Sequence, residues 1–258
     1  MCSPGKHLST DVPHSQRQWS GPKADICATP PKITPLLPQK SCNRVLDTVP
    51  LRTRERFMAD LPAGFFQGTE MPTAGWWEAL WPDPAGVLAA VSLRPSMGVI
   101  DLCSGDGWFT LQIAKVARHV FAIDIDPTLL EVARHRLAEN GVTNCTFKAG
   151  DAYDIAKLTS PADFVFMANA FHGVPDPIRL AQAVKDALKA DGRFAIVNWH
   201  KRSREETPIL GEPRGPKTEL RMSPEETIKS VEEGGLKFIK IVEIRPYHYG
   251  VVFTRAAD

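Results

Sequence analysis

Two acidic residues and a glycine-rich turn follow three successive apolar runs, a placement that suits ligand binding. Asp124 lies near the end of the run VFAIDI, and Asp151 follows the run NCTFKAG. A carboxylate at a strand end can accept hydrogen bonds from both hydroxyl groups of a ribose. The carboxylate of Asp151 and the backbone N–H of Ala152 suit the exocyclic amine and the ring of an adenine. These groups are expected to converge on one nucleoside.

Gly105 and Gly107 form the turn between the apolar run VIDLC and the amphipathic segment WFTLQIAKVA. Glycines at such a turn let backbone N–H groups and a helix N-terminus approach a ligand closely. The turn lacks the GxGxxG spacing of a dinucleotide site, and Trp108 stands where a pyrophosphate needs space. An NAD-dependent oxidoreductase is therefore disfavoured.

The elements that must position these residues alternate between strands and helices. A first helix begins at Pro84 with Asp83 as N-cap. This spacing implies parallel pairing with helices on both faces, while the short turn before the last strand requires an antiparallel pair. The expected strands are 99–103, 120–125, 144–150, 163–169, 193–199, 237–244 and 248–255, and the other expected helices lie near 108–117, 127–139, 177–189 and 223–234.

The predicted fold class is α/β. It is a Rossmann-like, doubly wound, mostly parallel seven-stranded sheet with an antiparallel C-terminal hairpin. Residues 1–52 are rich in Pro, Ser, Lys and Thr without periodicity, and we expect a disordered extension there. The remaining 53–258 is expected to form one domain, with an N-terminal lid segment at 53–83 and the Rossmann-like core at 84–258.

Composition narrows the class of partner. The formal net charge of +1 provides no global field toward nucleic acid or an anionic membrane, and no apolar run approaches the length of a membrane span. The five cysteines are scattered without a CxxC pair, so no metal site is expected. We expect a cytoplasmic protein with a small-molecule partner. The sequence leaves the oligomeric state open.

Four segments together resemble the class I S-adenosylmethionine-dependent methyltransferases, and within them the ubiquinone/menaquinone C-methyltransferase-like (methyltransferase type 11) group. The segments are VIDLCSGDGWFTLQIA, AIDIDPTLLEVAR, GDAYD and DFVFMANAFHGVPDP, and the resemblance covers about 84–258. It implies S-adenosyl-L-methionine as cofactor, S-adenosyl-L-homocysteine as product, and a C-, O- or S-centred small-molecule acceptor.

The resemblance also implies residue roles. Asp101 would orient the loop and reach the methionine amine, Gly105 and Gly107 would admit the methionine part, and Asp124 would bind the ribose. The family usually has glycine at the position of Cys103, so we expect this turn to accept a side chain with a negative φ. The full cofactor-binding set expected is Asp101, Cys103, Gly105, Gly107, Asp124, Ile125, Asp151, Ala152 and Asn169.

The acceptor is expected beyond the carboxyl ends of the strands, where an open parallel sheet binds ligands. His172 has the ordinary pKa of a general base, although it could instead shape the loop before the next helix together with Asp176. Polar residues 200–223 are expected to form a lid, with Arg204 and Arg214 able to meet an anionic acceptor. The acceptor-site candidates are Trp77, Phe171, Trp199, His200 and Tyr247.

Two alternatives stay open at this point. Trp77 and Trp81 share a helical face and could either pack in the core or close over a ligand. The fold alone also permits a non-catalytic scaffold or nucleoside-sensing partner protein. The absence of an Asn-Pro-Pro-aromatic segment after the fourth strand disfavours methylation of DNA bases and protein amides, and the cysteine spacing disfavours arsenite.

Overall fold

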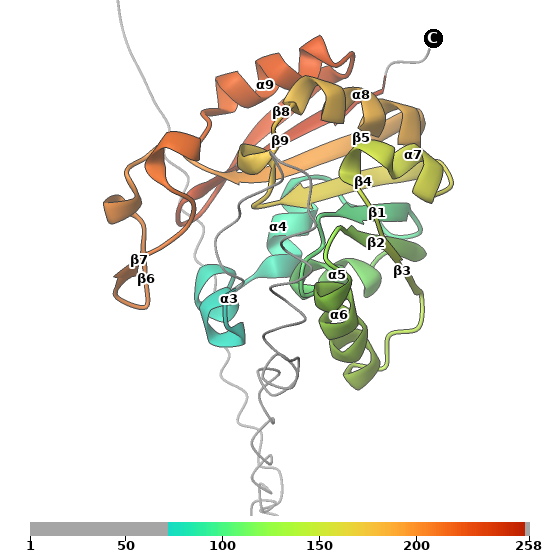
Figure 1. The fold of residues 1–258 in the computed structure, drawn as a ribbon, viewed down its shortest axis with the longest axis horizontal. Helices are drawn as coiled ribbons and strands as arrows, with labels where there is room; N and C mark the ends of the chain where they lie inside the picture. Colours follow the sequence, from blue (N-terminus) through green and yellow to red (C-terminus); the bar gives the residue numbers. More distant parts are fainter. Residues whose placement is uncertain (1–71, 256–258) are drawn as a thin grey trace, which may run out of the picture. The chain divides into compact units, whose positions relative to one another are not determined.

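The computed structural model describes residues 72–255, and its centre is a seven-stranded sheet in the order β3-β2-β1-β4-β5-β9-β8 (Figure 1). The first five strands in this order are parallel to their neighbours, and β9 runs antiparallel to both β5 and β8. The strands are β1 (Gly98–Leu102), β2 (His119–Asp124), β3 (Cys145–Ala149), β4 (Ala162–Ala168), β5 (Leu188–Trp199), β8 (Lys237–Ile244) and β9 (His248–Thr254). The predicted fold class is confirmed.

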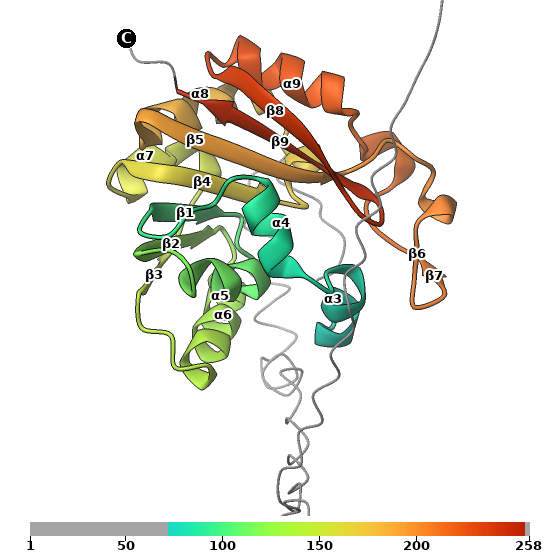
Figure 2. The same ribbon diagram turned by 180° about the vertical axis from the view of Figure 1, so that it is seen from behind.

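Helices cover both faces of this sheet (Figures 1 and 2). α4, α5 and α6 lie on one face, and α7, α8 and α9 lie on the other. The helices are α3 (Ala74–Leu80), α4 (Pro84–Ala90), α5 (Trp108–Ala114), α6 (Pro127–Glu139), α7 (Ile155–Leu158), α8 (Pro177–Ala187) and α9 (Pro224–Glu233).

Several helices begin at a proline that follows a capping side chain. Asp83 and Asp126 accept hydrogen bonds from backbone N–H groups in the first turns of α4 and α6. Ser223 and Glu226 form a reciprocal capping box at the start of α9. Proline lacks the N–H that would be unsatisfied at this position, and the cap satisfies one of the others. These starts agree with the helices expected from the sequence.

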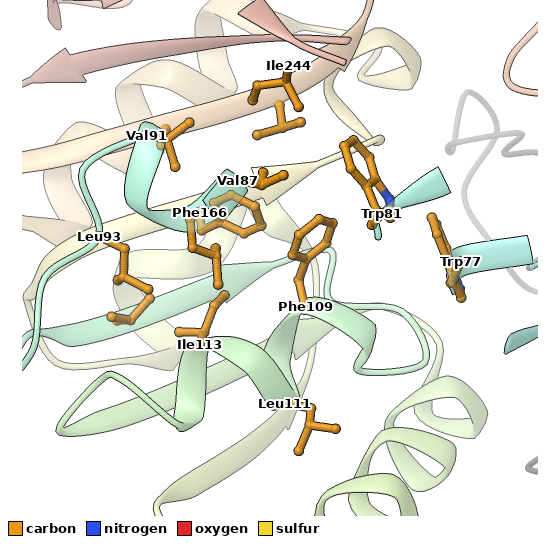
Figure 3. Packing of buried hydrophobic residues seen from close by; sticks show 14 of the residues in the cluster. Trp77, Trp81, Val87, Val91, Leu93, Phe109, Leu111, Ile113, Phe166 and Ile244 are labelled. Atoms are coloured by element: carbon orange, nitrogen blue, oxygen red, sulfur yellow. The ribbon is translucent and has the colours of Figure 1, made fainter. Parts of the chain in front are cut away.

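The core has two layers because alternate strand residues face opposite sides of the sheet. Val99 and Phe166 pack against α4 and α5, together with Trp81 and Phe109 (Figure 3). Ile100 and Val165 belong to the opposite layer, which α8 and α9 cover. Burial on both faces explains why these strands read as continuous apolar runs.

Three local features differ from the sequence expectation. β5 begins at Leu188, so α8 is shorter than expected, and a register shift separates this first contact with β4 from the rest. α3 and α7 were not among the expected helices. The expected lid at 200–223 is partly folded, with a small hairpin of β6 (Pro208–Ile209) and β7 (Glu212–Pro213) and a fully buried Arg221.

The expected extension at 1–52 and most of the expected lid segment at 53–83 lie outside the described residues. No helix within residues 72–255 is both long and apolar enough to cross a lipid bilayer.

Candidate functional site

A cavity of about 370 Å³ lies at the carboxyl ends of the parallel strands. The chain places β2 and β3 on one side of β1 and β4 and β5 on the other, which makes a topological switch point. Residues that follow β1, β2, β3 and β4 line the cavity, and Trp199 at the end of β5 joins them. Trp76 and Trp77 of α3 supply a further wall. The expected crevice is therefore present.

The turn after β1 is tightly tied to the end of β2. Gly105 N donates to Asp124 Oδ2 over 2.8 Å, and Asp126 N donates to Asp124 Oδ1 over 3.0 Å. Gly105 has a φ of 55° and Cys103 a φ of 58°, both in the left-handed region. The expectation of a negative φ at Cys103 is therefore wrong, because the turn keeps the conformation that glycine usually supplies and the cysteine adopts it.

Three of the carboxylates that line this cavity lie at the ends of neighbouring strands. Burial raises the pKa of Asp101 to about 7; the hydrogen bond from Thr110 opposes the shift, and the charge of Asp124 adds to it. Burial also raises the pKa of Asp124, against the two backbone hydrogen bonds that it accepts. Burial first, then the charges of Asp124, Asp101 and Asp151, raise the pKa of the Cys103 thiol. This end of the cavity therefore favours a cationic ligand.

The rest of the expected cofactor set is divided. Ile125 and Ala152 line the same cavity, beside Asp124 and Asp151 respectively. Gly107 does not line it. A Cβ at Gly107 would lie 2.7 Å from the Cβ of Ala133, so this glycine allows α5 to approach α6. Its role is close helix packing.

The sequence reasoning did not single out Asp106, which also lines the cavity. Its carboxylate forms a largely buried ion pair with Arg136 over 2.6 Å, and Arg136 lies over the ring of Trp108. Burial raises the pKa of Asp106, and the charge of Arg136 opposes that shift. Asp106 is thus neutralised within the protein, unlike the three carboxylates beside it. The acidic residue between the two glycines was the available sequence signal.

Asn169 occupies the end of β4 in a left-handed conformation with a φ of 56°. Its Oδ1 atom lies 3.0 Å from Nε2 of His248, and its backbone N–H donates to Val197 O. His248 is fully buried, with its ring 4.4 Å from that of Trp81 and 4.2 Å from that of Trp199. When Oδ1 of Asn169 accepts a hydrogen bond from His248, the N–H₂ group of the Asn169 amide points away from His248.

His172 lines the cavity and is buried. Its Nδ1 atom lies 2.9 Å from Oδ1 of Asn198, which assigns the proton to Nδ1. Burial lowers the pKa of His172 to about 4; the bond to Asn198 opposes the shift, and the charge of Arg221 adds to it. The expected ordinary pKa is therefore wrong, since a neutral imidazole is strongly favoured at this buried position.

Aromatic side chains make the wall beside β4 and β5. Trp76 contacts Trp77 edge to face at 4.9 Å between ring centroids and lies 6.4 Å from Trp199. Trp77 stacks with Trp108 at 6.4 Å. Of the predicted pair, Trp77 lines the cavity, whereas Trp81 lies in the core against Phe109 (Figure 3). Trp81 is therefore a core residue, and Trp77 lies at the cavity wall.

The other acceptor candidates lie outside the cavity lining. Phe171 is fully buried in the layer covered by α8. His200 contacts the Glu243 carboxylate at 3.0 Å. Tyr247 stacks on Trp199 at 6.1 Å and donates its hydroxyl hydrogen to Pro208 O. Tyr247 contacts the wall through Trp199, and Phe171 and His200 do not line the cavity. Among residues 72–255, no three potential metal-ligating side chains lie close enough to hold one ion.

The fold and the lined switch point are those of a class I S-adenosylmethionine-dependent methyltransferase, as predicted. Residues 93–231 match the family described as methyltransferase domain, which is more than half of the chain. The chain belongs to this family.

Solved structures share this fold. A SAM dependent methyltransferase from Aquifex aeolicus has a TM-score of 0.61 and 25% sequence identity, covering 71% of this chain and 94% of that one. The [4+2]-cyclase SpnF is similar in fold, with a TM-score of 0.55, 15% identity, and coverage of 68% of this chain and 80% of that one.

Curated relatives match over shorter segments. A ubiquinone biosynthesis O-methyltransferase from Xylella fastidiosa (strain 9a5c) is 31% identical over 134 residues, which covers 48% of this chain and 54% of that protein. A protein-L-isoaspartate O-methyltransferase from Methylorubrum extorquens (strain PA1) is 30% identical over 155 residues, covering 59% and 64%. The chain thus spans between half and two thirds of the length of these relatives.

Proposed function

We propose that this protein transfers a methyl group from S-adenosyl-L-methionine to a small-molecule acceptor. The observation that carries the proposal is the group of three carboxylates, Asp101, Asp124 and Asp151, at the ends of β1, β2 and β3. S-adenosylmethionine carries a sulfonium and an ammonium, so it suits a cavity in which burial and mutual repulsion raise carboxyl pKa values. NAD carries a pyrophosphate, which the same carboxylates would repel.

The cavity also suits a nucleoside by shape. The left-handed backbone at Gly105 keeps the loop close to β2, where Asp124 can accept from ribose hydroxyls. The buried hydroxyl of Ser104 has no hydrogen-bond partner within the described residues, and Ser104 lines the cavity. Asp151 and Ala152 face the same cavity and are proposed to bind adenine. Asp101 is proposed to bind the methionine ammonium.

When bound, the cofactor supplies an electrophilic methyl group on a sulfonium, and the protein must position the acceptor in line with it. The β4 end provides Asn169 and His172 at the cavity. We propose that both are neutral hydrogen-bonding groups beside the acceptor. His172 is not proposed to act as a general base, since its lowered pKa makes it a weak base near neutral pH.

The names of the two relatives point to different acceptors. One refers to ubiquinone biosynthesis and the other to protein L-isoaspartate. The acceptor wall here consists of enclosed aromatic side chains, and a small molecule fits it better than a polypeptide. A cytoplasmic location agrees with this proposal.

Titration calorimetry of the full chain with S-adenosylmethionine, S-adenosylhomocysteine and NAD tests the proposal. We expect binding of the first two and none of NAD. Asp124→Asn should weaken binding by about tenfold or more, since a charged hydrogen bond contributes about 1.5–3 kcal/mol. Asp163→Asn is the matched control, because Asp163 also accepts a backbone N–H, from Gly98 at the opposite end of the sheet. Absence of S-adenosylhomocysteine binding in the wild-type protein would favour a non-catalytic scaffold.

A further inference from the structure

The cavity has a different chemical character at each end. On the side of β1, β2 and β3 it is lined by carboxylates, including Asp101, Asp124 and Asp151. On the side of β4 and β5 the wall beside Asn169 and His172 consists of tryptophan, proline and glycine residues. It comprises Pro72, Trp76, Trp77, Trp199, Gly215 and Pro216. The second end is therefore suited to a flat ligand that stacks on indole rings.

A buried cation lies directly behind this aromatic wall. Arg221 is 2% exposed, and its guanidinium carbon lies 5.1 Å from the ring centroid of Trp199. Its Nε atom donates to Pro216 O, and Nη2 donates to Thr207 Oγ1 and Arg214 O. A Cβ on Gly215 would lie 2.9 Å from the Trp199 ring and 3.0 Å from Nη2 of Arg221. The guanidinium is thus separated from the cavity by one ring and one backbone turn.

The charge of Arg221 is not neutralised locally. Within residues 72–255 it forms no salt bridge, and its Nη1 atom has no hydrogen-bond partner. Buried charges are usually paired, because an unpaired one is costly. Arginine nevertheless stays protonated. A positive field therefore reaches the aromatic end of the cavity.

The charged groups nearest Arg221 have opposite signs. Arg204 adds positive charge, whereas Glu205 opposes it from an exposed position. Burial lowers the pKa of His172 and of His248, and the positive charge of Arg221 lowers both further. Both side chains are therefore neutral. A cationic acceptor is disfavoured at Trp199, because the guanidinium already lies over that ring.

We propose that the acceptor is a flat aromatic molecule that binds against Trp76, Trp77 and Trp199 and reacts as its oxygen or sulfur anion, which the buried positive charge of Arg221 stabilises. This proposal rests on the proposed function and specifies its acceptor. The acceptor loses its proton to solvent as it binds. The anion then forms a bond to the methyl carbon, the carbon–sulfur bond breaks, and its electron pair stays on sulfur. The charges of the anion and the sulfonium cancel in this step. No protein base is required, because the proton has already passed to solvent.

Arg221 is a positioning residue in this scheme, since it acts through Trp199 and the cavity field without touching the acceptor. It also differs from Arg214, an arginine of the expected lid. Arg214 is exposed, and its backbone carbonyl accepts a hydrogen bond from Arg221.

A chromogenic phenol tests the proposal without turnover. 4-Nitrophenol is titrated with pH in the presence of the full chain saturated with S-adenosylhomocysteine, and the absorbance of its anion is recorded. We expect the bound phenol to ionise about one pH unit or more below the free phenol, which is a tenfold change in its ionisation equilibrium. 4-Nitrobenzylammonium should not compete for the site.

Variants separate charge from structure. Arg221→Gln should abolish the shift, and Arg221→Lys should retain most of it because the charge stays. Trp199→Leu should weaken nitrophenol binding by about tenfold or more, since stacking on an aromatic ring contributes about 1–3 kcal/mol. Arg179→Gln is the control, because Arg179 lies over Tyr153 at the carboxylate end of the same cavity. It should leave the shift unchanged.

Calorimetry with S-adenosylhomocysteine is run on every variant. Retained cofactor binding shows that a variant is folded and that the proposed function stands independently of the acceptor proposal. The acceptor proposal is overturned if the wild-type protein binds nitrophenol without lowering its pKa, if the ammonium binds in its place, or if nitrophenol does not bind to the cofactor-saturated protein. An equal shift in Arg221→Gln and the wild type would remove Arg221 from the scheme.

Discussion

At the scale of single residues, Asp101 carries the clearest electrostatic conflict of the site. It is buried beside Asp124, and its pKa is raised to about 7 from an ordinary value of 3.8. The folded ligand-free protein therefore binds a proton at Asp101 that the unfolded chain releases at lower pH. Stability should fall as pH rises from about 4 to about 7. A cationic ligand that pairs with the ionised Asp101 carboxylate can restore the stability lost on this pH rise.

The first prediction concerns cofactor affinity and pH. The affinity for S-adenosylhomocysteine should rise as pH increases from 6 to 8, because below about 7 the ligand ammonium meets a protonated Asp101. Calorimetry at the two pH values, in buffers of different ionisation enthalpy, should show proton release at pH 6. Asp101→Asn should remove both the release and the pH dependence. A wild-type affinity independent of pH would contradict the assigned pKa.

The second prediction concerns His172. Burial holds its pKa near 4, with Nδ1 bonded to Asn198. Its imidazole resonances in an NMR titration should therefore show no midpoint between pH 5.5 and 8. Asn198→Asp places a carboxylate against Nδ1 and should raise the pKa of His172. A wild-type midpoint near 6.5 would restore His172 as a general base.

The sequence and its family resemblance predicted part of the set of side chains that line the cavity, but not their electrostatic state. Asp101, Asp124, Asp151 and Asn169 all line one cavity. The pKa of His172 could not be predicted, because it depends first on burial in the folded protein and then on contacts with distant residues such as Asn198. Arg221 was likewise hidden in a polar segment, since its burial depends on folding of the hairpin before it.

At the scale of elements, α5 and α6 are packed unusually closely at Gly107. This glycine begins α5 with a φ of 79°, and a Cβ there would lie 2.7 Å from the Cβ of Ala133 on α6. The left-handed conformation and the close approach both require glycine. The position of α5 in turn sets the loop that carries Gly105 and Cys103.

The third prediction is that Gly107→Ala destabilises the protein by about 2–4 kcal/mol. The left-handed conformation contributes about 1–2 kcal/mol and overpacking contributes the rest. Gly141→Ala is the matched control, because Gly141 has a φ of 69° with nothing within 4 Å of its added Cβ. It should cost only about 1–2 kcal/mol. Urea unfolding measures both, and equal losses would contradict the packing role.

Elements with strong local signals were predicted closely. α6 and α9 start at a proline after a capping Asp or Ser, and the predicted 127–139 agrees with α6. α3 has no such signal. Its N-cap residue Thr73 makes no side-chain capping bond, and its tryptophans are held by packing against Trp199 and Trp108. Contacts of that kind depend on distant residues and cannot be read from a local pattern.

At the scale of the whole molecule, the cavity joins five strands and α3 through their ends. A ligand that contacts several of these ends should stabilise the domain as a unit. The fourth prediction is that S-adenosylhomocysteine at about 100 times its Kd raises the stability by about 2.7 kcal/mol, with a corresponding rise in Tm. NAD at the same concentration should leave Tm unchanged. A rise with NAD but not with S-adenosylhomocysteine would contradict the cofactor class.

The most direct measurement of the central claim is a crystal structure of the full chain with S-adenosylhomocysteine. We expect the ribose at Asp124, the adenine at Asp151 and Ala152, and the homocysteine sulfur directed toward the end of β4. The space beside Trp76 and Trp199 should stay open for the acceptor. An adenosine group stacked between those tryptophans, with no contact to the three carboxylates, would contradict the division of the cavity into a cofactor end and an acceptor end.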